Sequence, residues 1–498
     1  MDKKPCDNNV KTPIGIGSFL ERAKQQSEEK LTGVIVVKAS LKNQWLNEIS
    51  KFSDLKAIVL QTYKSSVKSE SAKIKARQKK MDQLIKESAI NNADEIANLK
   101  NEITELEKQA EITFNSMFDK QKYDLFIVNY ETIVDEKVRY KLHELNIQFW
   151  YIDEADCIKN NKAQRSKAIY EFKYAKYKFG ATATPIRKNP KDLFGIFSFL
   201  NPKLFPSESV FDNTYLKFYF GRVSGSQNEE LLAKKVEPYF FKRSYDEIAS
   251  QLPKQTVIQL YCEFTDKQFR MNNTLMAEIE EYKEQEKSMH ARFSLQQLQN
   301  NAEYKQLEAN IVARQTFAQM LADDEELLRS SESNLAHKYL TNSKSTKVEL
   351  CMELLEKIID SGEKVCIFSR FIGIQEILEK EIDNNASMEG IVVSKITGSV
   401  SDKERAIILD QYNTMDDHQI LLLSDAGEAG INLSQTRYLI EFDLADSAAK
   451  QTQRHGRIQR ADSKHSHVFV YQLICRDSWD EIAQKIIAKK GEYADRIL

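Results

Sequence analysis

Short runs of almost wholly apolar residues recur along the chain, and longer stretches with helical spacing separate them. Strands of a parallel sheet have this composition because helices cover both of its faces. The runs form two series, which are GVIVVKAS (33–40), KAIVLQTY (56–63), YDLFIVNY (123–130), FWYIDEAD (149–156) and YKFGATATP (177–185), then KVCIFSRF (364–371), IVVSKITG (391–398), QILLLSDA (419–426), RYLIEFDL (437–444) and HVFVYQLIC (467–475). The pattern predicts an α/β protein with two parallel-sheet domains in tandem.

Composition restricts the partners that such a chain can have. Lys and Arg number 72 against 74 Asp and Glu, so the net charge is −2 and any nucleic-acid surface must be local. No apolar run approaches the length of a membrane helix, and the N-terminus lacks a signal-peptide pattern, which predicts no membrane partner. The six cysteines form no Cys-x-x-Cys pair, so we expect neither a zinc site nor a disulfide framework, and a cytoplasmic location.

Two highly charged stretches interrupt the α/β pattern. Residues 66–117 carry apolar side chains at heptad spacing, at Ile96, Leu99, Ile103, Leu106 and Ala110, with a shorter stripe at Ile74, Met81 and Ile85. We expect an antiparallel helical hairpin of coiled-coil type that projects from the first domain and could recruit a protein partner. A single solvated helix with a loop is the alternative, because a charge run usually marks a solvated face. Residues 256–340 are expected to form a helical bridge.

An acidic pair follows the fourth run of the first series. In YIDEAD, Asp153 and Glu154 would stand at the carboxyl end of a parallel strand, the edge at which open α/β sheets bind ligands. Asp153 would hold Mg²⁺, and Glu154 would polarise an attacking water molecule. One such pair alone is common, so the prediction depends on the motifs that accompany it.

Further motifs follow in order. GATATP (180–185) lies where a loop would sense the γ-phosphate, and SDAGEAGINL (424–433) is a loop of small residues that includes Gly430. QRHGRIQR (453–460) is expected to place Arg457 and Arg460 one helical turn apart on a single face. Two guanidinium groups presented to a bound phosphate would act as arginine fingers.

The ordered set of motifs resembles that of the superfamily-two helicase-type ATPases, which have DEAD/DEAH-like motifs, and in particular that of the Swi/Snf branch. The matching segments are VVKASLKNQWLNEISKF, IDEADCIKNNKAQRSKAI with Asp156 in the His position of the Asp-Glu-Ala-His box, ATATPIRKNPKDLFGIFSFLNP, EPYFFKRSYDEIASQLPKQ, KVCIFSRF, ITGSVSDKERAIILDQY and SDAGEAGINL with QRHGRIQR. The resemblance implies two RecA-like domains, at 1–255 and 341–498.

The resemblance also implies a function. Members hydrolyse ATP between the two domains and translocate along double-stranded DNA, with Asp153 and Glu154 as the Walker B pair, Arg457 and Arg460 as the fingers and Gln453 near the nucleotide. Segments that touch the DNA backbone in the family would include Ser40, Tyr130, Ser369, Thr397 and Ser424. Two alternatives remain open: a strand-separating helicase, and a catalytically defective motor that serves as a DNA-binding module. The compact architecture suggests a bacterial or viral setting.

The resemblance begins abruptly near the N-terminus. KTPIGIGSFL (11–20) aligns with the end of a Walker A motif, so Lys11 would contact the β- and γ-phosphates of ATP and Thr12 would bind Mg²⁺. PCDNNV (5–10) stands where a glycine-rich loop is expected, and no apolar strand precedes it. A second polypeptide that supplies the missing strand, a truncated start and a degenerate motor are the competing explanations. We therefore expect this chain alone to bind ATP poorly.

Overall fold

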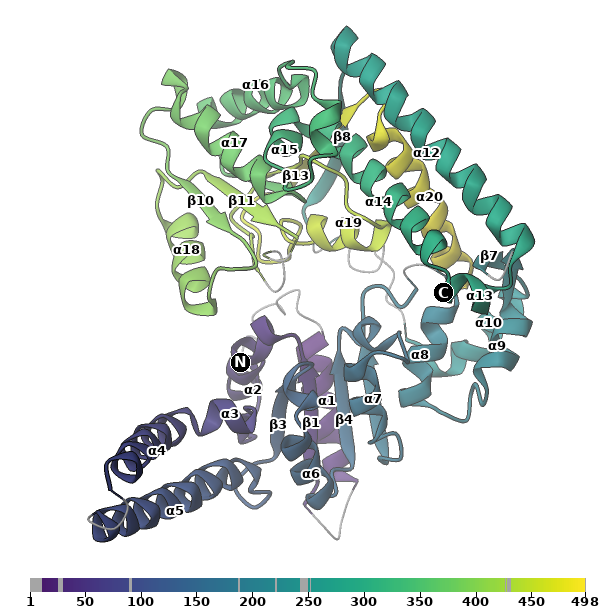
Figure 1. The fold of residues 1–498 in the computed structure, drawn as a ribbon. Coiled ribbons are helices and arrows are strands. Elements are labelled where there is room, and N and C mark those ends of the chain that lie inside the picture. Colours follow the sequence, from purple (N-terminus) through teal and green to yellow (C-terminus); the bar gives the residue numbers. More distant parts are fainter. Residues whose placement is uncertain are drawn as a thin grey trace. The chain divides into compact units, whose positions relative to one another are not determined.

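The computed structural model describes the chain apart from residues 1–10, 26–29, 89–91, 187–188, 220–221, 242–249, 251, 426, 428–430 and 498. Its fold is drawn in Figure 1. Among the described residues, one compact unit comprises 11–185 and 191–210, and the second comprises 186–190 and the chain from 211 onward. None of the described helices is both long and apolar enough to cross a bilayer.

The first unit is built on a five-stranded parallel sheet. Its strands are β1 (Gly33–Val37), β2 (Ala57–Val59), β3 (Leu125–Asn129), β4 (Phe149–Asp153) and β5 (Tyr177–Ala181), in the order β2-β3-β1-β4-β5. All of the pairings are parallel, with Val34 of β1 opposite Phe126 of β3 and Trp150 of β4. The sheet confirms the first series of predicted strands, and the carboxyl ends of β1, β3 and β4 meet at one edge.

Alternate side chains of this sheet enter two separate cores. On one face, Ile35, Ile127 and Tyr151 pack against α1 (Lys11–Lys24) and α2 (Lys42–Phe52). On the other face, Val36, Val128 and Ile152 belong to a cluster formed with α6 (Glu136–Glu144), α7 (Gln164–Tyr170) and α8 (Lys191–Leu200). Helices on both faces explain why the strands read as continuous apolar runs.

A pair of antiparallel helices extends from the first unit after the short helix α3 (Tyr63–Ser66). Helix α4 (Lys68–Ser88) packs along α5 (Ala93–Asn115), and two ion pairs, Arg77–Glu102 and Lys80–Glu95, cross between them. The pairs have decreasing numbers on α4 matched to increasing numbers on α5, which is the register of an antiparallel hairpin. The base of α5 enters the core of the unit through Ala110 and Phe114.

The second unit contains a six-stranded parallel sheet. Its strands are β8 (Lys254–Cys262), β9 (Val365–Ser369), β10 (Val393–Ile396), β11 (Ile420–Ser424), β12 (Tyr438–Glu441) and β13 (His467–Cys475), in the order β10-β11-β9-β12-β13-β8. The second series of predicted strands is thus confirmed. Strand β8 differs from the sequence prediction, because residues 254–262 were assigned to the end of the first domain and the start of a helical bridge. They instead pair with β13 over nine residues, so the division at 255 falls inside this unit.

Helices cover both faces of this sheet. Helices α16 (Thr346–Asp360) and α17 (Ile372–Asp383) pack on one face, and α18 (Asp402–Thr414) contributes Tyr412 to the other. A helical layer follows β8 in sequence: α12 (Asp266–Arg292), α13 (Leu295–Asn300), α14 (Ala302–Asp323) and α15 (Glu325–Arg329). The other elements are α9 (Glu208–Tyr215), β6 (Leu216–Tyr219), β7 (Arg222–Ser226), α10 (Glu229–Val236), α19 (Ala448–His455) and α20 (Trp479–Ile497).

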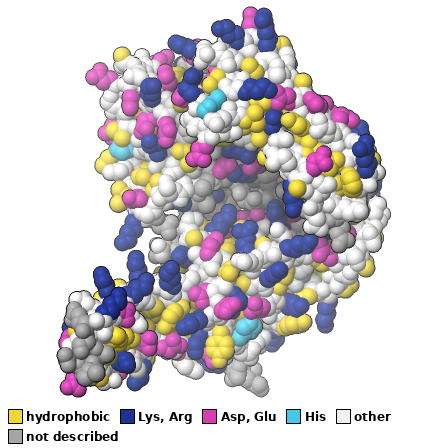
Figure 2. All heavy atoms as spheres, in the orientation of Figure 1, with side chains coloured by type: hydrophobic (Ala, Val, Ile, Leu, Met, Phe, Trp, Pro, Cys, Tyr) yellow, Lys and Arg dark blue, Asp and Glu magenta, His cyan; other side chains and the backbone are white. Residues whose placement is uncertain are grey.

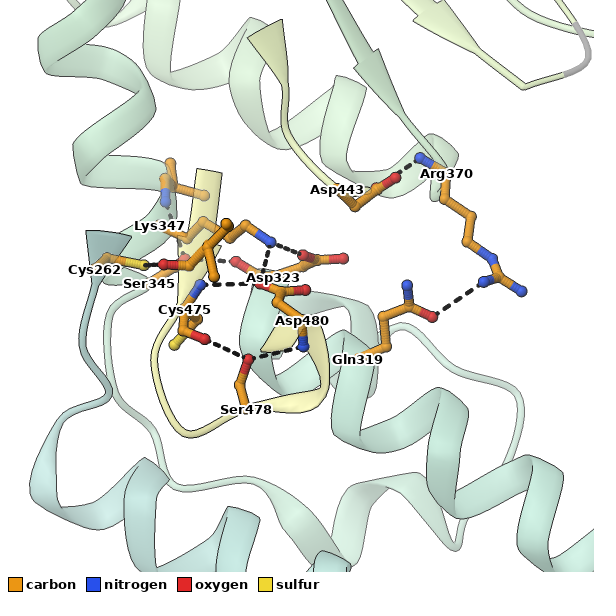
Figure 3. Close-up of polar contacts among 12 residues, drawn as sticks. Cys262, Gln319, Asp323, Ser345, Lys347, Arg370, Asp443, Cys475, Ser478 and Asp480 are labelled. Atoms are coloured by element: carbon orange, nitrogen blue, oxygen red, sulfur yellow. Dashed lines mark hydrogen bonds and ion pairs between the residues drawn. The ribbon is translucent and has the colours of Figure 1, made fainter. Parts of the chain in front are cut away.

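A buried lysine joins the helical layer to the sheet of the second unit (Figure 3). The side chain of Lys347 at the start of α16 is fully buried, and its Nζ donates to Asp323 of α14 and Asp480 of α20, each at 2.8 Å. Burial opposes the charge on Lys347, but the two carboxylates outweigh it and raise its pKa well above the ordinary value. Burial raises the pKa of Asp323, near which Asp443 also lies. One lysine therefore holds three helices through ionic hydrogen bonds in a low-dielectric interior.

We expect Lys347→Met to lower the free energy of unfolding of the second unit by about 3–5 kcal/mol, because two buried carboxylates would lose their cation. Denaturant unfolding measures the effect. Lys344→Met, at an exposed lysine three residues away, is the matched control and should stay within about 0.5 kcal/mol of the parent protein. Equal effects of the two variants would show that the buried lysine does not hold these helices together.

Candidate nucleotide and nucleic-acid site

Asp153 is the last residue of β4, beside the centre of the first sheet, and is only 4% exposed. Its Oδ2 accepts a hydrogen bond from Trp45 Nε1 at 3.0 Å, and its Oδ1 accepts one from the backbone N–H of Glu154 at 3.0 Å. These two bonds orient the carboxylate at the end of the strand.

The chain reverses sharply after this strand. Glu154 has a φ of 55°, a left-handed conformation that non-glycine residues rarely adopt, and the 3₁₀ helix η4 (Ala155–Ile158) follows it. Tyr130 Oη donates to the carbonyl oxygen of Asp153 at 2.6 Å and to that of Glu154 at 3.1 Å. Such strain persists only where surrounding contacts support it, and the Tyr130 hydroxyl is one of those contacts.

Tyr130, which lies in a segment predicted to touch the DNA backbone, is buried in this structure. It is 2% exposed, and burial, followed by the charges of neighbouring acidic groups, raises its pKa well above the ordinary value. The hydroxyl thus stays protonated and donates to the backbone beneath the acidic pair. In this structure the Tyr130 hydroxyl supports the turn, and contact of its segment with DNA stays a prediction.

The loop after β5 is linked to the acidic motif. Asp156, in the position of the family's histidine, is buried, and its Oδ1 accepts a hydrogen bond from Thr182 Oγ1 at 3.2 Å. The same Thr182 oxygen accepts from the backbone N–H of Thr184 at 3.0 Å. The GATATP loop is therefore connected by a side-chain hydrogen bond to η4, which directly follows the acidic pair.

Helix α1 brings the first residues of the described chain to the same region. Gly15 lies so close to Trp45 that an added Cβ would come within 2.9 Å of the indole ring, and Trp45 also binds Asp153. Thr12, one turn earlier, is fully buried, and its Oγ1 has no hydrogen-bond partner among the described residues. A buried hydroxyl in this state suits a ligand such as hydrated Mg²⁺. The side chain of Lys11 and the segment PCDNNV lie outside the described part of the chain.

Three residues predicted to lie in DNA-contacting segments stand at the carboxyl edge of the second sheet. Ser369 ends β9, Ser424 ends β11 and Thr397 directly follows β10. Ser369 Oγ donates to the carbonyl of Phe371 at 2.9 Å, and Ser424 Oγ accepts from the N–H of Gly427 at 3.2 Å. Ser369 and Ser424 are buried, whereas Thr397 and Ser40, the latter in η1 (Ala39–Leu41) after β1, are partly exposed. DNA contact by these segments stays a prediction.

The small-residue loop after β11 follows the sheet closely. A Cβ added to Gly427 would lie 2.2 Å from the carbonyl oxygen of Ile396, so only glycine fits beside the end of β10. This close approach is to another part of the protein. Gly430, the predicted nucleotide contact of this loop, lies outside the described residues.

The predicted arginine fingers do not share a helix, which corrects the sequence-based expectation. Helix α19 ends at His455, and Arg457 and Arg460 lie in the turns beyond it. Their guanidinium groups nevertheless converge, because Arg457 Nη1 lies 3.5 Å and Arg460 Nη2 lies 3.1 Å from the carbonyl oxygen of Ile431. Gly456 is a poor helix former, and the N–H of Leu433 bonds to the carbonyl of Arg457, which holds the turn in place.

A third arginine of this motif was missed by sequence reasoning. Arg454 is 1% exposed, its Nη1 donates to the carbonyl of Asp443 at 3.0 Å, and its Nη2 donates to Asp425 at 2.5 Å. Burial opposes ionisation of Asp425, but Arg454 and Lys450 outweigh it and hold its pKa below the ordinary value. Glu441 is also fully buried, with Arg454 Nη1 3.5 Å from its Oε1. No local pattern distinguishes the buried Arg454 from the partly exposed Arg457 and Arg460, because burial is decided by strands distant in sequence.

Asp443 follows β12 and is fully buried beside Arg454. Its Oδ2 accepts from the backbone N–H of Arg370 at 2.7 Å, whereas its Oδ1 has no partner among the described residues. Burial raises the pKa of Asp443 to about 6, although Arg454 and the Arg370 N–H favour the charged form. The end of β9 and the end of β12 are thus joined by a carboxyl group that gains a proton just below neutral pH.

We expect Tyr130→Phe to lower kcat for ATP hydrolysis by on the order of 10-fold with little change in KM, because Glu154 would lose part of its support. The free energy of unfolding should fall by about 1–3 kcal/mol, because a buried carbonyl loses its donor. Steady-state kinetics and denaturant unfolding measure the two effects. Tyr174→Phe, at a site 83% exposed, is the control, and an unchanged kcat in both variants would contradict the positioning role.

The raised pKa of Asp443 predicts a pH dependence of stability. The folded state keeps the proton up to about pH 6, whereas an unfolded aspartate loses it near about pH 4. The stability contributed by Asp443 therefore falls as pH rises through this window. Asp443→Asn removes the titration, so its stability relative to the parent should increase by up to roughly 3 kcal/mol between about pH 4 and about pH 7. Urea unfolding across this range, with the exposed Asp383→Asn as control, tests the sign, and parallel pH profiles of parent and Asp443→Asn would refute it.

Comparison with known proteins identifies two successive domains along the chain. The profile of the SNF2-related domain matches residues 12–311, and that of the helicase conserved C-terminal domain matches residues 346–462. Similar curated proteins include the ATP-dependent helicase fft2 of Schizosaccharomyces pombe, 24% identical over 424 residues that cover 74% of this chain and 32% of that protein. The ISWI chromatin-remodeling complex ATPase ISW2 of Saccharomyces cerevisiae is 25% identical over 394 residues, covering 77% of this chain and 32% of that protein.

A solved structure is also similar. The Sulfolobus solfataricus SWI2/SNF2 ATPase core in complex with dsDNA is 23% identical, with 98% of this chain and 86% of that chain covered and a TM-score of 0.37. The chain spans about a third of the length of the curated relatives named above. Since the SNF2-related profile covers more than half of its residues and a helicase C-terminal domain follows, the chain belongs to the SNF2-related family.

Proposed function

We propose that this chain is a DNA-dependent ATPase that translocates along double-stranded DNA. The observation that carries the proposal is the acidic turn at the carboxyl end of β4, where Asp153 is held by Trp45 and Glu154 stands in a left-handed conformation above Tyr130. A strained turn that presents two carboxyl groups at a parallel-sheet edge has the construction of a catalytic site. Membership of the SNF2-related family directs that chemistry toward a nucleotide.

In this proposal, Asp153 and Thr12 hold Mg²⁺, and the chain's own groups fit that role. Asp153 is a carboxylate held in a fixed orientation by Trp45 and the Glu154 N–H, and the buried Thr12 hydroxyl has no partner among the described residues. When bound, Mg²⁺ and ATP would supply the phosphoryl group and the charge neutralisation that its transfer requires. Glu154 would orient and polarise the attacking water molecule, and Lys11 would contact the β- and γ-phosphates.

The second unit supplies the remaining polar groups of the proposal. Arg457 and Arg460 already converge on one carbonyl oxygen, which supports a joint role as fingers that stabilise charge on the transferred phosphate. Gln453 and Gly430 remain proposed nucleotide contacts. For DNA, the segment around Ser40 of the first unit and those around Ser369, Thr397 and Ser424 of the second offer hydroxyl and backbone donors that bind phosphate without reading sequence. That property suits a motor that must pass any base pair.

DNA-stimulated ATP hydrolysis of this chain, with Glu154→Gln as the test variant, checks the proposal. We expect stimulation by double-stranded DNA and a loss of on the order of 100-fold or more in Glu154→Gln, because the water would lose its polarising carboxylate. Glu381→Gln, at an exposed glutamate of the second unit, is the control and should retain full activity. Hydrolysis that is independent of DNA, or equal in the two variants, would contradict the proposed function.

Two further measurements separate the alternatives. Displacement of a third strand from a DNA triplex without separation of the duplex supports a translocase, whereas duplex unwinding supports a helicase. Folded protein that binds DNA but hydrolyses no ATP supports the DNA-binding module. Restoration of activity by an added N-terminal polypeptide would support a second chain that completes the phosphate loop. A cytoplasmic site in a bacterial or viral setting stays a prediction.

A further inference from the structure

Helix α4 of the hairpin carries a regular row of lysines. Lys68, Lys75, Lys79 and Lys86 are all exposed, and their spacing of seven, four and seven residues places them within an arc of about 40° on an α-helix. The row extends over about 27 Å along the helix axis. Figure 2 shows dark-blue basic side chains along the α4 edge of the hairpin.

The row lies on the face of α4 opposite to its partner helix. Ile74, Arg77, Met81 and Leu84 are partly buried and face α5, and they lie about 160° to 240° around the helix from the row. Between the four lysines stand mainly small or uncharged residues, such as Ala72 and Gln83. Asp82, about 40° from the centre of the row, is the nearby exposed acid, so the face is strongly positive.

These lysines serve no ionic purpose within the hairpin. None of the four forms an ion pair with another described residue, whereas Arg77 and Lys80 of the same helix pair with Glu102 and Glu95 of α5. Acidic residues are concentrated on α5, at Asp94, Glu95, Glu102, Glu105, Glu107 and Glu111. Opposite charges are therefore segregated onto two helices, and the outer face of α4 keeps its positive charge for an external partner.

The base of the hairpin is packed into the core of the first unit. Phe114 at the end of α5 is 1% exposed and packs against Phe118 and Tyr63, with ring centroids 5.1 and 5.2 Å apart, respectively. Val67, between α3 and α4, is also buried in this core. A ligand held by the row would thus be held at a defined position on the first unit.

We propose that the outer face of α4 is a second contact surface for the phosphate backbone of double-stranded DNA, outside the predicted contacts at the sheet edges. This inference rests on the proposed function. Double-stranded DNA carries one charge per about 1.7 Å and turns once in about 34–36 Å, so a straight 27 Å row of cations laid along one side of the duplex spans most of a turn and meets phosphates where each strand passes that side. Lysine is a mobile point charge, which suits a contact that must form and break as the duplex moves.

The test compares the full chain with two variants of equal charge change. The row variant is Lys68→Gln, Lys75→Gln, Lys79→Gln and Lys86→Gln combined. The control combines Lys267→Gln, Arg270→Gln, Lys283→Gln and Lys287→Gln, all exposed on α12 of the second unit. Glutamine is a helix former of similar propensity to lysine, and circular dichroism with thermal unfolding checks that both variants fold.

Affinity for a duplex of about 40 base pairs, measured by fluorescence anisotropy from about 50 to about 200 mM KCl, gives the number of phosphate contacts. In the row variant we expect the slope of log K against log salt to become shallower by up to about 3.6, with affinity at low salt reduced by 10-fold or more. The control should keep the parental slope and lie within about threefold of its affinity.

The outcomes distinguish DNA binding by the α4 face from the proposed function as a whole and from binding of another kind of partner. Parental slopes in the row variant, with DNA-stimulated ATP hydrolysis intact, would overturn this inference and leave the proposed function standing. A parent chain that binds no DNA would overturn both. Row-dependent binding to vesicles with about 30% anionic lipid, without any effect on DNA, would assign the face to a membrane surface instead. Unchanged DNA binding together with loss of an acidic protein partner would likewise refute the DNA assignment.

Discussion

Parallel pairing of the central strands is the constraint on which both units of this protein depend. Because every strand in each main sheet runs in the same direction, the last residues of neighbouring strands reach one common edge. Asp153, Ser369 and Ser424 each end a strand at such an edge. Within each sheet, the buried apolar strands therefore bring polar residues to one edge although these residues are far apart in the sequence.

The polar side chains at the sheet edge are held by different kinds of interaction in the two units. In the first, neutral donors hold one carboxylate and the turn behind it, namely the indole of Trp45 and the hydroxyl of Tyr130. In the second, charged groups are buried together, with Arg454 beside Asp425 and Asp443. Buried charges are costly unless each is paired, so the second edge is sensitive to protonation.

The predicted strands and helices agree with the structure in most places and differ from it in two. The ten predicted strand runs are all present, because continuous apolar stretches bounded by polar residues carry a clear signal. Strand β8 was missed, since an edge strand with alternating exposure reads like the start of an irregular linker until it pairs with β13. The helical continuation through Arg457 was also wrong, because Gly456 and the bond between Leu433 and Arg457 end the helix at His455.

By itself, the sequence determined the class of fold, the order of the motifs and the position of the Asp153–Glu154 pair after an apolar strand. These features depend on local composition and spacing, which are visible along one chain. Only the tertiary structure decided that Tyr130 supports the acidic turn, that Arg454 is buried while Arg457 and Arg460 converge on Ile431, and that the lysine row lies opposite α5. Burial and hydrogen-bond partners arise from residues distant in sequence, so no local pattern specifies them.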